Sequence, residues 1–383
     1  MTTKRVAIGI GLLLLGYFYF KKKKSVVANG VEDLIGNTPM VKIKSLSKAT
    51  GCTILAKAEF LNVAGSPKDR VALSIINQAE KDGLISPNTN CCIFEGTVGS
   101  TGISLATIAK AKGYKCHIVM PDDVAVEKSE LLMKLGATVE LVKPCSIVDP
   151  NHFVNLAKKR ANDMNVTADN LSSKERGFFC NQFENLANFD AHFTTTGPEI
   201  FQQTGGEIDA IVMGAGTGGT LAGITHYLKP KIPHLKVVLA DPEGSGLYNK
   251  VKFNVMYAKQ EAEGTRKRHQ VDTIVEGVGI NRLTANFKKL LGGWIDDAIR
   301  VTDIEAVEMS RYLVREDGIF VGSSSAVNCV AAVRLAKQLG PGHTIVTILC
   351  DHGSRHFTKF WSDTYIANSG LTPTSEGLEF LSL

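Results

Sequence analysis

Residues 210–220 read AIVMGAGTGGT, a run of small and apolar residues that ends in a glycine-rich turn. The run is typical of a buried strand in a parallel sheet, and the turn is typical of the point where such a strand leads into a helix. Backbone N–H groups in such a turn, together with the positive end of the helix, can hold an anion. The turn lacks the lysine of a nucleotide-binding P-loop, and close packing of strand and helix would explain the same glycines.

The same alternation of strand-like and helix-like segments extends along the chain on both sides of this turn. Strands are expected at 52–60, 91–97, 115–121, 138–143, 236–244 and 344–351, and helices at 68–83, 101–113, 126–136, 151–164, 304–317 and 324–339. This pattern predicts an α/β fold with mostly parallel sheets covered by helices, arranged as two units with a cleft between them. The polar stretches 165–178 and 253–272 are predicted to be surface insertions.

Two further turns that join a strand to a helix carry residues suited to chemistry. The first, residues 62–70, reads NVAGSPKDR and places Lys68 at the start of a predicted helix. The helix dipole disfavours a cation there and lowers the pKa of the ammonium group, which suits a lysine that bonds covalently to a carbonyl group. A surface lysine paired with Asp69 is the alternative. The second turn, residues 95–102, reads EGTVGSTG and suits a carboxylate, unless its hydroxyl groups only cap the helix.

Together these turns match one family in order and spacing. The matching segments are IGNTPM (35–40), NVAGSPKDR (62–70), TVGSTG (97–102), QFENLAN (182–188), GTGGT (216–220), EGVG (276–279) and GSSSA (322–326). On these segments, residues 30–365 resemble the fold-type II pyridoxal-phosphate (PLP) enzymes, which are similar to the tryptophan synthase β-subunit. Within them the chain resembles the branch of cysteine synthase (O-acetylserine sulfhydrylase) and cystathionine β-synthase.

The resemblance implies a division into domains. A large PLP-binding domain would comprise residues 25–60 and 190–365, and a small domain that closes on the substrate would comprise residues 61–189. Residues 366–383, which contain threonine, proline, serine and glycine, are expected to form a loose tail.

The resemblance also assigns roles to individual residues. Lys68 would be the catalytic residue that bonds covalently to PLP, Ser324 would face the ring nitrogen, and Ser100 would reach the ring oxygen. The phosphate group would be held by Gly216, Thr217, Gly218, Gly219 and Thr220. The substrate carboxylate would be bound by Thr97, Thr101 and Gln182. A neutral hydroxyl opposite the ring nitrogen suits β-elimination better than transamination.

The implied activity is formation of L-cysteine from O-acetyl-L-serine and sulfide by a homodimer, with the amine of Lys68 as the base for the α-proton. Val98 and Ser100 depart from the family pattern, which has serine and asparagine at these positions. Losing a hydrogen bond to a charged group costs about 1.5–3 kcal/mol, so these departures bear on both rate and substrate preference. The alternatives are a cystathionine β-synthase-type condensation with a thiol, deamination of serine or threonine, and a PLP-binding regulatory protein that has lost turnover.

The N-terminal residues account for the charge imbalance of the protein. The 383 residues have a formal net charge of +5, but residues 1–24 contain six basic residues and no acidic one. Removing these six charges leaves −1 for the remaining 359 residues. This near-neutral body gives no electrostatic support for nucleic-acid binding.

Between those basic residues lies an uncharged segment, residues 6–20, with the sequence VAIGIGLLLLGYFYF. As a helix it would span about 22 Å, against about 30 Å for the hydrocarbon core of a bilayer. Flanking lysines and interfacial tyrosines can close part of this gap. We therefore expect residues 1–24 to form an uncleaved N-terminal transmembrane anchor, with a secretory signal peptide or a buried core helix as the alternatives.

Four lysines follow the apolar segment and two basic residues precede it, so the body is expected in the cytosol. A short span with basic residues on both sides resembles anchors of the mitochondrial outer membrane, and the endoplasmic reticulum is the alternative. The eight cysteines are scattered without a C-x-x-C pair. They predict neither a disulfide framework nor a zinc site, and we expect no metal; most should be small buried hydrophobic residues.

Overall fold

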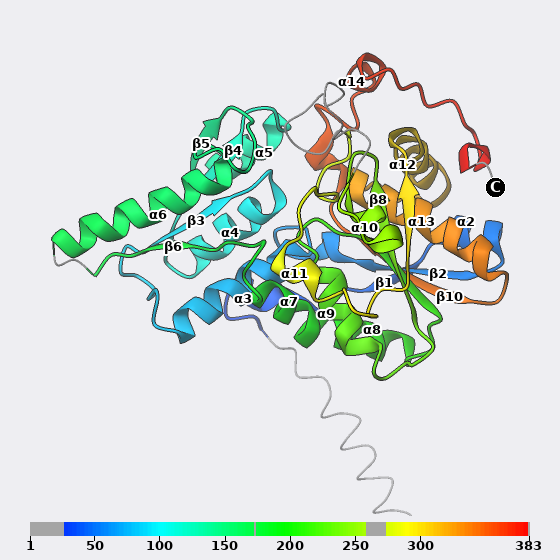
Figure 1. Cartoon of the computed structure of the whole chain (residues 1–383), viewed down its shortest axis with the longest axis horizontal. Coiled ribbons are helices and arrows are strands. Elements are labelled where there is room, and N and C mark those ends of the chain that lie inside the picture. Colours follow the sequence, from blue (N-terminus) through cyan, green and yellow to red (C-terminus); the bar gives the residue numbers. More distant parts are fainter. Residues whose placement is uncertain (1–26, 172–173, 258–272, 382–383) are drawn as a thin grey trace, which may run out of the picture.

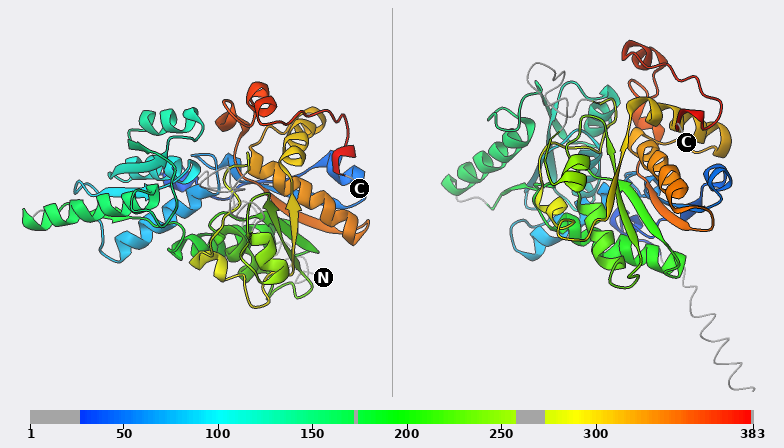
Figure 2. Two further views of the ribbon diagram at one scale, coloured as in Figure 1. Left: turned by 45° about the horizontal axis from the view of Figure 1, so that its top comes forward. Right: turned by 45° about the vertical axis from the view of Figure 1, so that its right-hand side comes forward.

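The computed structural model describes residues 27–171, 174–257 and 273–381, which form two α/β units that lie side by side (Figures 1 and 2). The larger sheet has six strands in the order β1-β2-β10-β7-β8-β9, and the smaller has four in the order β5-β4-β3-β6. Neighbouring strands are parallel throughout both sheets except for β1, which runs antiparallel to β2. The predicted α/β fold with two mostly parallel sheets is confirmed.

The two sheets draw their strands from different parts of the chain. The large sheet consists of β1 (Met40–Lys42), β2 (Thr53–Ala58), β7 (Ala210–Gly214), β8 (Lys236–Pro242), β9 (Asp297–Val301) and β10 (Thr344–Leu349). The small sheet consists of β3 (Cys92–Gly96), β4 (Lys115–Pro121), β5 (Thr138–Val142) and β6 (Gly177–Phe179). The chain therefore leaves the large sheet after β2, builds the whole small sheet, and then returns.

Helices cover both sheets. The α-helices are α2 (Lys44–Thr50), α3 (Lys68–Lys81), α4 (Ser100–Ala111), α5 (Val126–Lys134), α6 (Phe153–Asn170), α7 (Ala187–Ala191), α8 (Gly197–Thr204), α9 (Gly219–Leu228), α10 (Leu247–Phe253), α11 (Ala285–Lys288), α12 (Asp303–Asp317), α13 (Ser323–Leu339) and α14 (Asp363–Asn368). Single helical turns are η1 (Val31–Leu34), η2 (Glu59–Leu61), η5 (Gly353–His356) and η6 (Glu379–Leu381), and η3 (His192–Thr196) is a π-helical turn between α7 and α8.

The strands of the large sheet are buried on both faces, which explains their continuous apolar sequences. Along β7, Ala210 and Val212 belong to the core shared with α12 and α13, whereas Ile211 and Met213 belong to the core shared with α8 and α9. This alternation is the two-residue period of a strand. The helix α13 is buried along most of its length because it packs against the sheet and α12 together.

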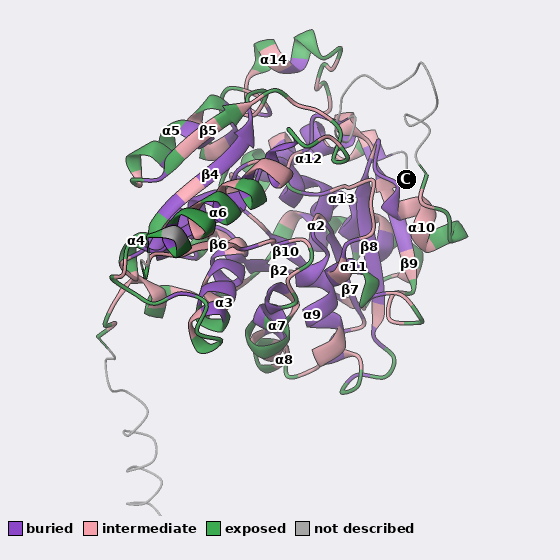
Figure 3. Ribbon diagram, turned by 60° about the vertical axis from the view of Figure 1, so that its left-hand side comes forward, coloured by how far each residue is buried: buried purple, intermediate pink, exposed green. Residues whose placement is uncertain are grey.

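The small sheet is also covered on both faces. On β3, Ile93 packs into the core formed with α3, α4 and α5, whereas Cys92 and Phe94 pack against Ala161 of α6. Figure 3 shows the exposed outer side of α6 and the contrast between β4, which is mostly buried, and the edge strand β5, which is partly exposed. The outer side of α6 is polar, and it faces solvent.

Residues 165–178 differ from their prediction as a surface insertion. The helix α6 continues to Asn170, and residues 177–179 form β6, which pairs with β3. Along α6, Ala157, Ala161 and Ala168 are buried, so one narrow face of small residues carries the packing and the many polar residues lie outside it. Such a face is easily overlooked in a sequence, because alanine is a weak hydrophobic signal.

Several predictions concern residues at the margins of the described structure. The predicted anchor, residues 1–24, lies outside the described residues, as does most of the predicted insertion at 253–272. Within the described ranges, no helix is long and apolar enough to cross a membrane. Near the C-terminus, Leu381 is buried and Leu378 and Phe380 pack against the core of the large unit. All eight cysteines are described and none of them forms a disulfide; six are buried, which confirms the prediction that most are small buried hydrophobic residues.

Candidate active site

A cavity of about 470 Å³ lies between the two units. The loops that directly follow β3, β7 and β10 line it, together with the start of α3. Ligands of open α/β sheets bind at the carboxyl ends of the strands, so this is the expected place for a site. Of the eleven predicted site residues, ten line the cavity: Lys68, Thr97, Ser100, Thr101, Gln182, Gly216, Thr217, Gly218, Thr220 and Ser324.

Lys68 is the first residue of α3, and its side chain lines the cavity. Burial lowers the pKa of its ammonium group, which favours a free amine. Its neighbour Asp69 accepts hydrogen bonds from the N–H of Ala64 at 2.6 Å and from the hydroxyl of Ser104 at 2.6 Å. The alternative interpretation, a surface lysine paired with Asp69, is therefore wrong.

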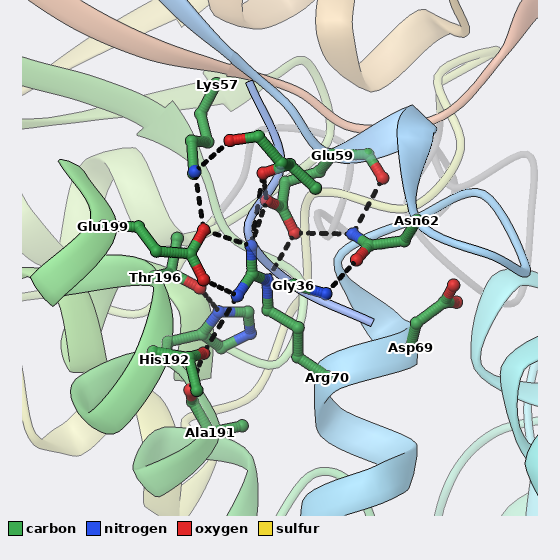
Figure 4. A network of polar contacts seen from close by, with 12 residues as sticks. Gly36, Lys57, Glu59, Asn62, Asp69, Arg70, Ala191, His192, Thr196 and Glu199 are labelled. Atoms are coloured by element: carbon green, nitrogen blue, oxygen red, sulfur yellow. Dashed lines mark hydrogen bonds and ion pairs between the residues drawn. The ribbon is translucent and has the colours of Figure 1, made fainter. Parts of the chain in front are cut away.

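The segment that carries Lys68 is held by a buried network of ion pairs, drawn in Figure 4. Arg70, two residues further along α3, donates to both carboxylate oxygens of Glu59, each at 2.8 Å. It also donates to both oxygens of Glu199, at 2.6 and 2.8 Å. Two bidentate pairs fix a guanidinium group in position and orientation, because its planar fork matches two carboxylates.

Lys57 balances the charge of this network. Its Nζ lies 2.6 Å from Glu199 and is fully buried at the end of β2. Although burial alone would raise it, the pKa of Glu199 falls to about 2 because Arg70 and Lys57 donate hydrogen bonds to its carboxylate. Asn62 completes the support by donating to Glu59 at 2.9 Å and accepting from the N–H of Gly36 at 2.8 Å. The network thus joins β2, α8 and the first turn of α3, which carries Lys68.

The glycine-rich turn lies between β7 and α9. Gly218 has a φ of +86°, which favours glycine, and a Cβ there would lie 2.6 Å from the backbone of Phe287. The first N–H groups of α9 have no partner within the helix and carry its positive dipole end. Thr220 in the first turn of α9 lies 3.1 Å from His192, whose other ring nitrogen lies 2.9 Å from Thr196. The turn therefore presents backbone and hydroxyl donors suited to a phosphate group.

Residues distant in sequence hold this turn in place. Asn188 donates to the hydroxyl of Thr217 at 2.9 Å, and Thr284 donates to the carbonyl of Thr217 at 2.6 Å. Gly219, the eleventh predicted residue, does not line the cavity: a Cβ there would lie 2.1 Å from the side-chain oxygen of Asn188. Thr284 was missed by the sequence analysis, and its 67-residue separation from Thr217 leaves no local signal.

Ser324 lies in the first turn of α13, buried, with its side chain at the cavity. Beside it, Cys350 at the end of β10 also lines the cavity and was not predicted as a site residue. Burial raises the pKa of the Cys350 thiol to about 11, so the thiol stays protonated near neutral pH. Ser324 and Cys350 thus both present neutral side chains to the cavity, and the Ser324 hydroxyl suits a neutral donor or acceptor facing a heterocycle.

The turn after β3 brings the predicted carboxylate-binding residues together. The hydroxyl of Thr101 donates to the side-chain oxygen of Gln182 at 2.6 Å, and Thr97 accepts from the N–H of Gly99 at 3.3 Å. Ser100 begins α4 and lines the cavity. Val98, which replaces a family serine, packs against the apolar cluster formed with α6. The turn retains hydroxyl, amide and helix N-terminal groups for a carboxylate despite this replacement.

The residues fit a PLP molecule chemically. A cradle of N–H and hydroxyl donors at 216–220 suits the phosphate group, Ser324 offers a neutral hydroxyl for the ring nitrogen, and the amine of Lys68 suits a covalent bond to the aldehyde carbon. No hydrogen bond or ion pair within the described part of the chain engages the Nζ of Lys68. Two parallel-sheet units around such a site define the fold-type II class of PLP enzyme.

Comparison with known proteins agrees with this class. The profile of the family described as pyridoxal-phosphate dependent enzyme matches residues 31–351, so the chain belongs to this family and PLP is its cofactor. The chain is 60% identical over 347 residues to cysteine synthase 2 of Schizosaccharomyces pombe, an alignment that covers 91% of this chain and 87% of that protein. It is 53% identical to a Saccharomyces cerevisiae protein provisionally named a mitochondrial cysteine synthase, over 94% and 92% of the two chains.

A solved structure shows the same fold. The O-acetylserine-dependent cystathionine β-synthase of Helicobacter pylori superimposes with a TM-score of 0.73 at 30% identity, covering 87% of this chain and 98% of that one. The resemblance to the cysteine synthase and cystathionine β-synthase branch is confirmed.

Proposed function

We propose that this protein catalyses PLP-dependent β-replacement, forming L-cysteine and acetate from O-acetyl-L-serine and sulfide. The observation that carries the proposal is the cavity that brings Lys68, the 216–220 turn and the 97–102 turn together from both units. Relatives at 60% identity over most of the chain are named cysteine synthase, which supports the same reaction here.

Each group at the cavity has a separate task. PLP, when bound, supplies an electron sink that makes the α-proton of an amino acid acidic. Gly216, Thr217, Gly218 and Thr220, which line the cavity, would hold its phosphate through N–H and hydroxyl donors, and Ser324 and Ser100 would face its ring. Thr97, Thr101 and Gln182 orient the substrate carboxylate. The amine of Lys68, whose pKa burial lowers, accepts the α-proton at Nζ.

The direct test is cysteine production from purified full-length holoenzyme. Cysteine should appear from O-acetylserine and sulfide, and parallel assays should pair O-phosphoserine and serine with sulfide or homocysteine. Production of cystathionine at a higher kcat/KM than cysteine would favour the condensation with homocysteine. Release of ammonia without a thiol product would favour deamination of serine or threonine.

A PLP-binding regulatory protein is the alternative from another class, and Val98 and Ser100 motivate it because both lie in the carboxylate-binding turn. In that case the visible spectrum of the bound cofactor would not respond to any of these amino acids. A spectral change on adding O-acetylserine that reverses on adding sulfide would instead support the synthase.

We also propose that residues 25–60 and 190–365 act as the large PLP-binding domain and residues 61–189 as the small domain that closes on the substrate. All four strands of the small sheet fall within 61–189, and the six strands of the large sheet fall outside it, which supports the division. Lys128 of α5 and Glu276 of the large unit form an ion pair across the cavity. Hydrogen-exchange protection that rises in α5 when substrate binds would support the closure.

We propose further that residues 1–24 anchor the protein in a membrane, with the mitochondrial outer membrane first and the endoplasmic reticulum second. The apolar segment between two basic clusters supports the anchor, and the name of the Saccharomyces cerevisiae relative supports a mitochondrial location but not the anchor. As the resemblance implies, we propose a homodimer, which light scattering after size-exclusion chromatography would test.

Deleting residues 1–24 is expected to move the protein from the membrane pellet to the supernatant while leaving its fold intact. The reason is that the deletion removes the uncharged 15-residue segment and six positive charges together. Carbonate extraction followed by circular dichroism measures both properties. Continued sedimentation of the deleted protein with membranes would show that another part of the chain binds them.

A further inference from the structure

One wall of the cavity is apolar and lies beside the turn for the substrate carboxylate. Val98, Phe153 and Phe183 all line the cavity and belong to one apolar cluster; we refer to these three residues as the apolar wall. Val98 is itself part of the 97–102 turn. A substituent of a substrate bound at this turn can therefore contact the apolar wall.

His152 adds one polar group to this wall. It precedes α6 as its N-cap, lines the cavity, and is only 7% exposed. Its Nδ1 accepts a hydrogen bond from the N–H of Val154 at 3.2 Å, and its ring lies 4.1 Å from that of Phe153. A neutral imidazole ring carries one proton. Because the Nδ1 of His152 accepts a hydrogen bond, it is unprotonated, and the proton is on Nε2. No residue of the described ranges accepts a hydrogen bond from this Nε2–H.

The ring of His152 is neutral at physiological pH. Burial, and secondarily the nearby positive charge of Arg282, lower the pKa of His152 to about 4, while Asp149 opposes this effect. His152 is therefore an N–H donor without charge. Such a donor matches a carbonyl oxygen better than an anion, because it forms a hydrogen bond without neutralising a charge.

The cations around the cavity are already engaged. Lys128 pairs with Glu276, and Arg282 pairs with Glu184 at 2.8 Å while its guanidinium lies over the ring of Phe183. Lys359 also lies near Glu276, at 3.9 Å. Apart from Lys68, each lysine or arginine that lines the cavity within the described ranges thus has a carboxylate partner. Lys128 and Lys359 share the carboxylate of Glu276, so a dianionic phosphate substituent would compete with Glu276 for them.

From this arrangement we infer that His152 is a specificity-determining residue, whose Nε2–H donates a hydrogen bond to the carbonyl oxygen of an acyl group on the substrate's β-oxygen. The methyl group of that acyl group packs against the apolar wall. The inference deepens the proposed function, on which it rests, by assigning the residue that recognises the acyl group of a neutral O-acyl serine and so favours it over O-phosphoserine. His152 acts in recognition and takes no part in proton transfer.

Replacement by asparagine isolates this donor. His152→Asn keeps a side-chain oxygen that can cap α6 but removes the N–H at the Nε2 position. We expect kcat/KM for O-acetylserine to fall about three- to tenfold, the effect of losing one neutral hydrogen bond. With β-chloroalanine, which has no carbonyl group on its leaving group, kcat/KM should not change. The control His343→Asn, at a half-buried histidine that does not line the cavity, should change neither value.

A binding measurement separates this inference from the proposed function. The ligands are β-N-acetyl-2,3-diaminopropionate, which keeps the acyl carbonyl on a poor leaving group, and 2-aminobutyrate, which lacks it. His152→Asn should weaken binding of the first about three- to tenfold and leave that of the second unchanged, as measured by calorimetry on the holoenzyme. Equal effects on both ligands, or none, would overturn the inference whether or not the enzyme uses O-acetylserine. Lack of turnover by the native enzyme would contradict only the proposed function.

The tautomer gives a readout independent of ligands. In nitrogen-15 NMR spectra of the holoenzyme, the signals that disappear in His152→Asn should show a neutral ring protonated at Nε2 at pH 6. A charged ring, or a proton on Nδ1, would contradict the role of His152 as a neutral donor.

Discussion

Replacing Lys68 with alanine is expected to lower kcat for cysteine formation at least about 10³-fold, because in the proposed mechanism this one side chain supplies both the covalent bond to PLP and the base for the α-proton. The structure supports this size of effect by placing Lys68 at the cavity with a lowered pKa and no acidic partner within the described residues. Other cavity lysines, such as Lys128, are held in ion pairs and cannot easily replace it. Steady-state kinetics with saturating PLP measure the loss.

Borohydride reduction provides an independent test of the same assignment. In the native protein it should attach the cofactor permanently to the peptide that contains Lys68, as identified by mass spectrometry. Lys81→Ala, at an exposed lysine in the last turn of the same helix, is the matched control and should keep full activity and labelling. Labelling of a different lysine in the native protein would show that the assignment of Lys68 is wrong.

Replacing Arg70 with methionine is expected to lower the free energy of unfolding by about 3–5 kcal/mol, the usual cost of removing one partner from a buried ion pair. Arg70 is 3% exposed and Glu59 is fully buried. Without Arg70, Glu59 would keep hydrogen bonds only from the neutral donors Thr38 and Asn62 among the described residues, so its buried carboxylate would lose its ion pair. Urea unfolding of the holoprotein, followed by fluorescence and circular dichroism, measures the change.

Two further variants make this prediction specific. Lys143→Met removes an ion pair with Asp122 whose lysine side chain is 90% exposed, and it should change stability by no more than about 1 kcal/mol. Arg70→Lys keeps the charge but loses the two bidentate contacts, so its stability should lie between those of the native protein and Arg70→Met. If Arg70→Met were as stable as Lys143→Met, the network would not be what holds the Lys68 segment.

The strands and helices that could be predicted from the sequence are those with strong local patterns. The strand predicted at 138–143 is observed as Thr138–Val142, and the helix predicted at 304–317 as Asp303–Asp317. The elements that escaped prediction include β9 and the end of α6 after residue 164, where Ala168 is buried. In both, contacts with the sheet or the opposing helix determine the structure more than the residues' own propensities.

In the candidate site, too, some features could be predicted from local sequence and others could not. Lys68, Ser324 and the glycine-rich turn belong to short segments whose residue types themselves indicate the chemistry. The interactions that hold these segments join residues far apart in the chain: Arg70 and Glu199 are separated by 129 residues. His152 has no local motif, and its significance depends on the hydrogen bond to Val154 and on the cavity beside it.

The sequence by itself determined the α/β class, the family and the candidate residues for binding the cofactor, because these depend on local periodicity and on glycine, lysine and hydroxyl residues at fixed short spacings. Only the tertiary structure decided which charges are paired, which side chains face the cavity and which ring nitrogen of His152 carries the proton. Those properties depend on burial and on contacts between distant segments, which set pKa values and hydrogen bonds.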